Sequence, residues 1–280
     1  MDTIHDIDSM RRCTATWRAE GRRVGFVPTM GNLHAGHLRL VEEARSRAER
    51  VVVSVFVNPL QFGPSEDFDT YPRTLAEDSA KLERLGVDVL FAPAESQMYP
   101  WGREAATRVE VPALSDILCG ASRPGFFVGV ATVVAKLFNI VAPHVTIFGE
   151  KDFQQLLVIR RMVADLNLDL EVVGVPTVRE PDGLAMSSRN GYLSEAERGI
   201  APALYRTLES VRDRLLAGER DFDALEADAS RRLDGAGLRP DYVSIRRSED
   251  LGSPEARDKA LIVLAAAWLG GARLIDNLRV

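Results

Sequence analysis

Two histidines stand three residues apart in a segment whose pattern predicts a strand, a turn and a helix. Residues 26–40 read FVPTMGNLHAGHLRL, and His34 and His37 lie at the start of the predicted helix, which we place near Leu33. Gly31 permits a tight turn, and a spacing of three puts both imidazoles on one face of the first helical turn. A helix N-terminus offers unpaired N–H groups and about half a positive charge. The pattern predicts a site for a transferring phosphoryl group, with a pair of ordinary capping histidines as the alternative.

A lysine and a glutamine follow a second predicted strand. The strand covers Val145–Phe148, and residues 148–155 read FGEKDFQQ. Ligands of doubly wound sheets bind beyond the carboxyl ends of the strands. Lys151 would supply a cation there, Asp152 can cap the next helix or bind a ribose hydroxyl, and Gln155 lies one helical turn beyond the lysine. The alternative is a solvated charge cluster that opens a helix.

A third polar segment is rich in turn formers. Residues 180–191 read EPDGLAMSSRNG. Within it, Ser187 and Ser188 offer hydroxyl and backbone donors, and Arg189 offers a planar guanidinium that suits phosphate. A flexible loop of this composition would serve as a lid that closes on a triphosphate and expels water. Taken alone, the segment is equally consistent with a plain polar turn.

Gln61 follows a third apolar run, VVVSVFV at residues 51–57. We expect it to lie at the carboxyl end of this strand, near the first helix, where its amide can bind both hydroxyl and carboxylate oxygens. The sequence Tyr71-Pro72-Arg73 either lines the edge of the same pocket or simply opens the next helix.

Strands and helices alternate through the first 175 residues, which predicts an α/β fold with a doubly wound parallel, Rossmann-like sheet. The predicted strands are 24–28, 51–57, 87–91, 145–148 and 170–175, and the predicted helices are 38–50, 74–85, 131–141 and 152–165.

The pattern changes near Val178, where we place a domain boundary. We predict a Rossmann-like domain over residues 1–178 that carries the predicted phosphate site, and a smaller C-terminal α+β lid domain over residues 179–280. The second domain is predicted to contain charged helices at 194–217 and 221–233 and strands at 242–246, 261–267 and 273–275.

Composition excludes several classes of function. The chain has 280 residues and a formal charge of −6, and a mildly acidic surface repels nucleic acid. No apolar run reaches the ~18 residues of a membrane span, and the N-terminus lacks the pattern of a secretory signal, so we expect a cytoplasmic protein. Cys13 and Cys119 lie far apart, which indicates neither a disulfide framework nor a zinc site.

The motifs PTMGNLHAGH, VNPLQF, YPR, FGEKDFQQ and REPDGLAMSSRN occur in this order, and RLIDN follows near the C-terminus. From about Phe26 to Leu193, this series resembles the pantoate–beta-alanine ligase family. The HAGH turn and the MSSR loop also resemble the signatures of class I aminoacyl-tRNA synthetases and related nucleotidylyltransferases. The resemblance implies that ATP and pantoate give pantoyl-adenylate and pyrophosphate, after which beta-alanine displaces AMP to form pantothenate.

The resemblance also implies site residues. Pantoate would be bound by Gln61 and Gln155, and beta-alanine by Gln61. The catalytic groups would be His34, His37, Lys151 and Arg189; His37 carries the role of proton donor in the family, although we expect it to stabilise the leaving pyrophosphate. Mg²⁺ would bridge the ATP phosphates with Asp78 as an indirect partner, and the chain would form a homodimer. The implied ATP site comprises Met30, Gly31, Asn32, Leu33, His34, Ala35, Gly36, His37, Gly149, Glu150, Lys151, Asp152, Val178, Met186, Ser187, Ser188 and Arg189.

The sequence departs from the family at one position, and three competing functions share parts of its pattern. Where the family commonly reads RPGHF, residues 123–127 read RPGFF, so Phe126 replaces a histidine at the edge of the pocket. A nucleotidylyltransferase that acts on a phosphorylated substrate would share the HAGH turn but would not need Gln61 and Gln155. A fragment of a tRNA synthetase would share the HAGH and MSSR segments, and a non-catalytic nucleotide-binding module would share the glycine turn.

Overall fold

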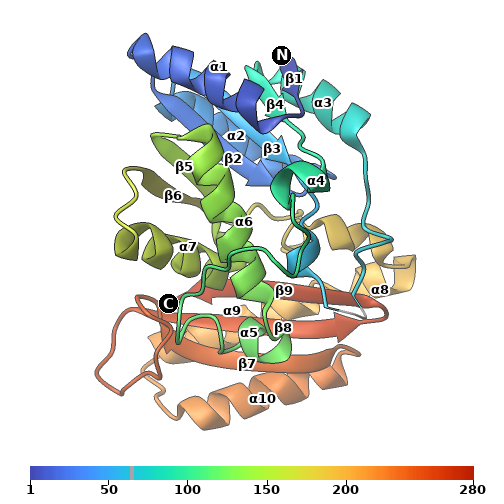
Figure 1. Cartoon of the computed structure of the whole chain (residues 1–280). Coiled ribbons are helices and arrows are strands. Elements are labelled where there is room, and N and C mark those ends of the chain that lie inside the picture. Colours follow the sequence, from blue (N-terminus) through green and yellow to red (C-terminus); the bar gives the residue numbers. More distant parts are fainter. Residues whose placement is uncertain (64–65) are drawn as a thin grey trace. The chain divides into compact units, whose positions relative to one another are not determined.

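The chain folds into two compact units. The computed structural model describes residues 1–63 and 66–280 (Figure 1). The first unit consists of residues 1–150 and 155–176, and the second consists of residues 151–154 and 177–280. Each unit has its own sheet.

The sheet of the first unit is parallel throughout. Its strands are β1 (Asp2–Ile4), β2 (Val24–Thr29), β3 (Arg50–Val55), β4 (Val89–Phe91), β5 (Val145–Gly149) and β6 (Glu171–Val175). They are arranged in the order β1-β4-β3-β2-β5-β6. This confirms the predicted α/β class with a doubly wound parallel sheet.

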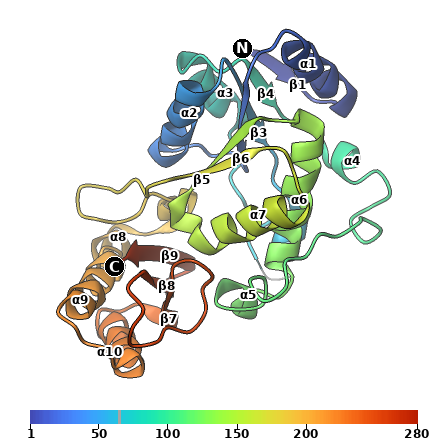
Figure 2. The ribbon, with the colours of Figure 1, turned by 90° about the vertical axis from the view of Figure 1, so that its left-hand side faces the viewer.

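Helices cover both faces of this sheet. Helix α2 packs on β2, β3 and β5 and also contacts α3, whereas α1 and α6 contact each other and β2. Figure 2 shows α2 and α3 on one side of the strands, and α1 and α6 on the other. Between residues 1 and 176 the helices are α1 (Ile7–Ala19), α2 (Ala35–Arg47), η1 (Pro59–Gln61), α3 (Leu75–Arg84), α4 (Glu95–Met98), α5 (Cys119–Ser122), α6 (Phe126–Val141), η2 (Glu150–Asp152) and α7 (Phe153–Asp165).

The order of the strands creates a switch point beside β2. Within the strand order, β3 and β4 lie on one side of β2, and β5 and β6 lie on the other side of β2. The carboxyl ends of β2 and β5 are therefore neighbours, and the turns that follow them diverge. In open α/β sheets, such a point is where ligands bind.

The second unit is a small α+β domain. Strands β7 (Arg239–Arg247), β8 (Leu261–Leu269) and β9 (Ala272–Arg279) form an antiparallel sheet in the order β7-β8-β9. Helix α9 (Ala203–Leu216) contacts β8 and β9, and α10 (Phe222–Gly235) contacts β7. The core between them is aliphatic and includes Leu204, Leu208, Leu225, Leu233 and Val263. The remaining helices of this unit are η3 (Ser188–Tyr192) and α8 (Glu195–Ile200).

Several predicted boundaries were wrong. The helix predicted to begin near Leu33, with helical periodicity over residues 38–50, spans 35–47: its start is close to the prediction, but it ends earlier, because Ala48 is already extended and Arg50 begins β3. The helix predicted at 194–217 is two helices that meet at Pro202, since proline cannot donate the backbone hydrogen bond that would continue the first one. The prediction also missed β1 and α1. Among the described residues, no helix is long and apolar enough to span a membrane.

His144 links three strands at the amino end of β5. Its N–H donates to the carbonyl of Val24 at 2.8 Å, its carbonyl accepts from the N–H of Glu171 at 3.0 Å, and its Nδ1 accepts from the N–H of Val24 at 2.9 Å. Because Nδ1 must accept, this geometry requires a neutral imidazole. Burial lowers the pKa of His144 below its usual 6.5, and the charges of Arg18 and Arg23 lower it further.

We predict that protonation of His144 destabilises the fold as the pH falls. A lowered folded-state pKa means that the stabilising contribution is complete above the unfolded pKa and is lost as the pH falls through the folded pKa. His144→Asn keeps an acceptor near the position of Nδ1 but cannot titrate. Urea unfolding between pH 7.5 and pH 5 should show a smaller loss of unfolding free energy in this variant than in the wild type. Parallel pH dependences in the two proteins would contradict this role.

Candidate functional site

The turn between β2 and α2 is held by a buried carboxylate. Gly31 and Asn32 both have positive φ, at 85° and 51°. A Cβ atom at Gly31 would lie 3.0 Å from Val55 Cγ1 and 3.2 Å from Asp78 Oδ2, so glycine fits both the conformation and the space. The two oxygens of Asp78 accept hydrogen bonds from the N–H groups of Asn32 and Leu33, each at 2.8 Å. The turn is therefore fixed from α3, 45 residues further along the chain.

Asp78 is completely buried and has further partners. The hydroxyl of Thr74 donates to Oδ2 at 3.1 Å, and the ammonium of Lys81 lies 4.0 Å from Oδ1. The same ammonium donates to the carbonyl of Leu33 at 2.8 Å. Both oxygens of Asp78 are thus occupied by groups of the protein, which assigns this carboxylate to the turn.

His34 and His37 form a capping box at the start of α2. His34 is the N-cap, and its Nδ1 accepts from the N–H of Gly36 at 3.1 Å. Nδ1 of His37 accepts from the N–H of His34 at 3.4 Å, and the two ring centroids are 4.1 Å apart. A ring nitrogen that accepts from a backbone N–H carries no proton, so in each neutral imidazole the proton is on Nε2. Both histidines are therefore donors through Nε2, which a phosphate oxygen requires.

The structure brings these two histidines together, and it places the segment that follows β5 beside the same strand. Gly25 and Phe26 of β2 pair with Val145 and Thr146 of β5. Gly149 ends β5 and Glu150 begins η2. The carboxyl ends of two adjacent strands thus carry two of the motifs that the sequence indicated.

Gln61 is oriented by its neighbours in η1. It is nearly buried, and its Oε1 accepts from Asn58 Nδ2 at 3.0 Å. Asn58 Nδ2 also donates to the carbonyl of Gly129 at 3.1 Å, and Asn58 Oδ1 accepts from the hydroxyl of Tyr99 at 2.7 Å. Burial raises the pKa of Tyr99, which keeps the phenol a donor. Because Oε1 is engaged, the Nε2 end of Gln61 is the part of the amide that suits a carboxylate ligand.

The side chain of Phe126 has a structural role. The guanidinium of Arg123 lies 3.7 Å from the centroid of the Phe126 ring, a cation–π contact. Arg123 also donates to both carboxylate oxygens of Glu66, each at 2.6 Å, and to the carbonyl of Gln61 at 3.0 Å. Phe126 thus supports the arginine that holds the main chain of Gln61.

The side chain of Arg73 binds carbonyl groups of the loop that precedes it. It donates to the carbonyls of Phe68, Asp69 and Tyr71 at 3.0, 3.1 and 3.2 Å. These bonds fold the chain just before α3, so the structure favours the interpretation of Tyr71-Pro72-Arg73 as a helix entry.

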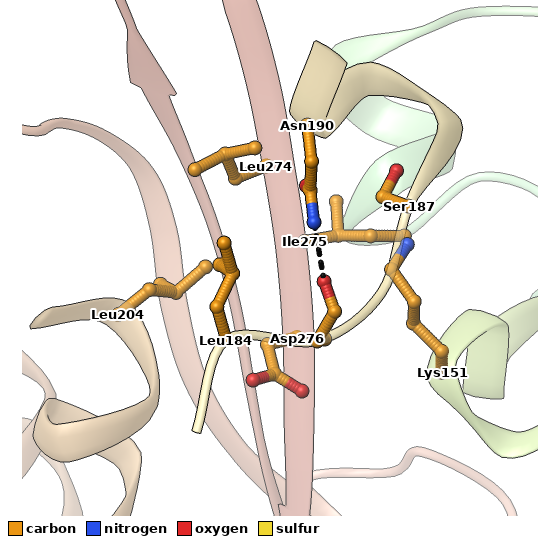
Figure 3. A pocket seen from close by; sticks show the side chains of 9 residues that line it. Lys151, Leu184, Ser187, Asn190, Leu204, Leu274, Ile275 and Asp276 are labelled. Atoms are coloured by element: carbon orange, nitrogen blue, oxygen red, sulfur yellow. Dashed lines mark hydrogen bonds between the residues drawn. The ribbon is translucent and has the colours of Figure 1, made fainter. Parts of the chain in front are cut away.

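In the second unit, Lys151 and Ser187 line one small pocket. Figure 3 shows the lysine side chain rising toward the loop that carries the serine. The side chain of Asn190 closes this loop by donating to the carbonyl of Ala185 at 3.1 Å. The other lining residues are Leu184, Ala185, Asn190, Leu204, Leu274, Ile275 and Asp276.

The segment predicted to be a flexible loop is a hairpin followed by a short helix. The N–H of Met186 donates to the carbonyl of Val178 at 3.0 Å, and Arg179 forms a β-bridge with Ala185. Ser187 then caps η3 by accepting from the N–H of Arg189 at 3.3 Å. The backbone from Val178 to Arg189 is therefore internally hydrogen-bonded.

The predicted site residues are divided between the units. Those before residue 151, together with Gln155, lie in the first unit, and Lys151, Asp152, Val178 and Met186–Arg189 lie in the second. Sequence reasoning gave no role to several residues that orient the site. Two of them could have been found in the quoted motifs, since Asn58 belongs to VNPLQF and Asp276 belongs to RLIDN. Nothing in the local sequence marks Tyr99.

Comparisons with known proteins agree over the whole chain. The family model described as pantoate-beta-alanine ligase matches residues 2–279. A pantothenate synthetase from Pseudomonas paraeruginosa is 58% identical over 280 residues, covering 100% of this chain and 99% of the relative. A crystal structure of pantothenate synthetase from Thermus thermophilus is similar with a TM-score of 0.92 at 49% identity, covering 99% of both chains.

A third relative carries ligands. The crystal structure of pantoate-beta-alanine ligase from Francisella tularensis, described as complexed with beta-gamma ATP and beta-alanine, is similar with a TM-score of 0.84 at 34% identity. The similarity covers 100% of this chain and 97% of that one.

We predict that Asp78→Ala loosens the turn after β2. The N–H groups of Asn32 and Leu33 would lose their acceptor, which costs roughly 1–3 kcal/mol for each buried donor. Hydrogen exchange should then show faster exchange at these two amides than in the wild type. Asp88→Ala is a suitable control, because it removes another carboxylate that accepts from a backbone N–H, that of Val51. Unchanged exchange at Asn32 and Leu33 in Asp78→Ala would refute the role of this carboxylate.

Proposed function

The chain belongs to the pantoate–beta-alanine ligase family, and we propose how its residues carry out the reaction of that family. The chain is an ATP-dependent ligase that condenses pantoate with beta-alanine to pantothenate through pantoyl-adenylate, releasing AMP and pyrophosphate. The observation that carries this function is a match to ligases along the entire length of the chain. A nucleotidylyltransferase acting on a phosphorylated substrate is not favoured, because the full-length relatives are named as ligases.

The chemistry requires activation of an unreactive acid. A carboxylate resists attack by an amine, because its carbon is shielded by negative charge and its oxygen is a poor leaving group. Attack of a carboxylate oxygen on the α-phosphorus of ATP breaks the bond to pyrophosphate and makes that oxygen part of a good leaving group, AMP. Two anions must approach each other in this step, so the site needs several donors directed at phosphate oxygens.

We assign the phosphate contacts in the first unit to His34 and His37. Each imidazole has its Nδ1 bound to a backbone N–H, so each donates to phosphate through Nε2. Both rings stand at the N-terminus of α2, whose dipole adds to their attraction for an anion. His37 then acts by stabilising the leaving pyrophosphate. Met30, Gly31, Asn32, Leu33, Ala35 and Gly36 complete this part of the ATP site.

We assign the cations of the ATP site to Lys151 and Arg189. A compact ammonium and a planar guanidinium both neutralise charge on a phosphoryl group during transfer. Lys151 and Ser187 line the same small cavity, so their side chains lie near each other in the second unit. The other proposed ATP contacts are Gly149, Glu150, Asp152, the backbone of Val178, Met186 and Ser188.

We assign the acid to Gln61 and Gln155. Gln61 follows β3 and Gln155 follows β5, and these strands flank β2 in the sheet. The contacts of Asn58 and Arg123 fix the orientation of Gln61, so that its Nε2 donates to pantoate and later to beta-alanine.

Mg²⁺ accompanies ATP in this proposal and has no dedicated protein cage. Within residues 1–63 and 66–280, no three His, Cys, Asp or Glu side chains are grouped as metal ligands. Asp78, the carboxylate considered as an indirect partner of the ion, accepts from two backbone N–H groups. Mg²⁺ commonly binds substrate phosphates and water with few protein ligands, and it would supply neutralising charge there. A homodimer is proposed on the family resemblance alone, and a cytoplasmic location on the apolar runs and the N-terminal sequence described above.

We predict that the wild type exchanges labelled pyrophosphate into ATP only when pantoate is present. Lys151→Ala should lower this exchange by about 10²- to 10³-fold, which is the usual cost of removing one donor to a developing charge. Lys259→Ala, which removes an exposed lysine of the same unit, is the control and should retain normal exchange. Pyrophosphate exchange without pantoate would refute the ligase mechanism. Normal exchange in Lys151→Ala would refute the assignment of that lysine.

We predict that Gln61→Ala raises the KM for pantoate by about 10- to 100-fold, the equivalent of one hydrogen bond to a charged group. The KM for ATP should change by less than about twofold, since Gln61 is assigned only to the acid and the amine. Steady-state kinetics with each substrate varied in turn would measure both values. Gln97→Ala, which removes an exposed amide that accepts from the N–H of Ile7, serves as the control. An unchanged dependence on pantoate would contradict the assignment.

A further inference from the structure

The last strand of the chain contacts two of the proposed ATP-binding segments through adjacent side chains. Asp276 and Asn277 lie in β9, within the RLIDN motif. We propose that Asp276 and Asn277 are positioning residues that hold Lys151 and the Val178–Arg189 segment in place for ATP. This inference rests on the proposed function and extends it to residues that touch neither ATP nor acid.

Asp276 holds the hairpin through Arg179. The carboxylate is almost completely buried, and Arg179 donates to it twice, from Nη1 to Oδ2 at 2.6 Å and from Nη2 to Oδ1 at 3.0 Å. The N–H of Asn277 also donates to Oδ1 at 2.8 Å. A paired, bidentate guanidinium has little freedom to rotate, so the carboxylate of Asp276 fixes both the orientation and the position of the Arg179 side chain.

Arg179 in turn holds the backbone of the Val178–Arg189 segment, which is proposed to contact ATP. Its guanidinium lies 3.8 Å from the ring centroid of Tyr205 and donates to the carbonyl of Gly183, at the tip of the hairpin, at 3.0 Å. Arg179 follows Val178 directly and bridges to Ala185, the residue before Met186. A shift of Arg179 would therefore move both proposed contacts of the hairpin with ATP, at Val178 and at the Met186–Arg189 segment.

Asn277 holds the lysine. Its Nδ2 donates to the carbonyl of Lys151 at 2.8 Å, a contact between residues 126 positions apart. The bond acts on the main chain, so the ammonium of Lys151 stays available for a phosphate. Neighbouring side chains on a strand point to opposite faces, which lets one strand bind two separate segments at once.

One residue of each contact, Asp276 from the first and Lys151 from the second, lines the same pocket. Lys151, Ser187 and Asp276 line it together, and Figure 3 shows the carboxylate of Asp276 at its lower end. Strand β9 therefore sets the separation between an ammonium and the serine-rich turn that are proposed to share the triphosphate. A site of this kind loses catalytic power when its supporting residues allow even a small displacement.

A purely structural role for these residues would look different from a positioning role. Loss of a structural contact lowers the stability of the second unit and leaves the ATP kinetics of the folded protein unchanged. Loss of a positioning contact changes the use of ATP in protein that is fully folded. The two roles are separated by measuring stability and kinetics on the same variants.

The test uses Asn277→Ala and Arg179→Lys in the full chain. Arg179→Lys keeps the charge but loses the bidentate geometry, and its control is Arg214→Lys. Arg214 makes a similar double contact with Glu219, through Nε at 2.8 Å and Nη2 at 2.6 Å, in the same unit. Pantoate-dependent pyrophosphate exchange gives kcat and the KM for ATP, calorimetry gives the affinity for ATP, and thermal unfolding gives stability.

We expect both test variants to lower kcat/KM for ATP by about tenfold or more, the size of one lost hydrogen bond to a polar group. The KM for pantoate should stay within about twofold of the wild type, and Arg214→Lys should alter only the melting temperature. Asn277→Gln, which keeps the donor, should recover part of the loss. ATP kinetics and affinity that match the wild type in folded Asn277→Ala and Arg179→Lys would overturn the inference.

The calorimetric arm separates this inference from the proposed function. If the wild type binds ATP but shows no pantoate-dependent exchange, the proposed reaction fails, while weaker binding in the two variants would still support the positioning role. If both variants match the wild type in ATP affinity and, where exchange occurs, in kcat/KM for ATP, the positioning role fails.

Discussion

The parallel pairing of β2 with β5 is the contact on which the nucleotide-binding end of the first unit depends. Only two residue pairs join these strands, Gly25 with Val145 and Phe26 with Thr146, and the hydroxyl of Thr146 adds a bond to the carbonyl of Phe26 at 3.2 Å. Because the chain leaves the two strands toward opposite sides of the sheet, the turns that follow do not compete for space. The adjacent carboxyl ends of β2 and β5 are thus a consequence of strand order, before any functional side chain is considered.

The turns at this edge are built so that their donors remain directed at a ligand. Asp78 occupies the N–H groups of Asn32 and Leu33 that would otherwise need water, while the histidines accept from backbone through Nδ1 and donate through Nε2. The two imidazoles and the helix N-terminus offer hydrogen-bond donors to an anion at this edge. The fixed positive charges of Lys151 and Arg189 are carried by the second unit.

Periodicity predicted the parallel sheet and most of its helices, because buried strands such as β3 and amphipathic helices such as α3 impose their own spacing on the sequence. It missed α1, a largely exposed helix in which only Met10 and Thr14 are buried. The motifs indicated which segments do chemistry, but the contacts that orient them join distant positions. Asp78 reaches back 45 residues to Leu33, and no local pattern contains that information. Such contacts depend on tertiary packing, which is why the supporting residues were the part of the site that sequence reasoning assigned poorly.

Phe126 is one part of a set of contacts that hold the segment of Gln61. Gln61 is held by the amide of Asn58 at its Oε1 and by the guanidinium of Arg123 at its carbonyl. Helix α6 also presses against η1, because a Cβ atom at Gly129 would lie only 2.1 Å from the carbonyl oxygen of Leu60. Phe126 needs only to present an aromatic face to Arg123, a requirement that an imidazole and a phenyl ring both meet. Gln61 therefore stays fixed because three separate contacts hold its segment.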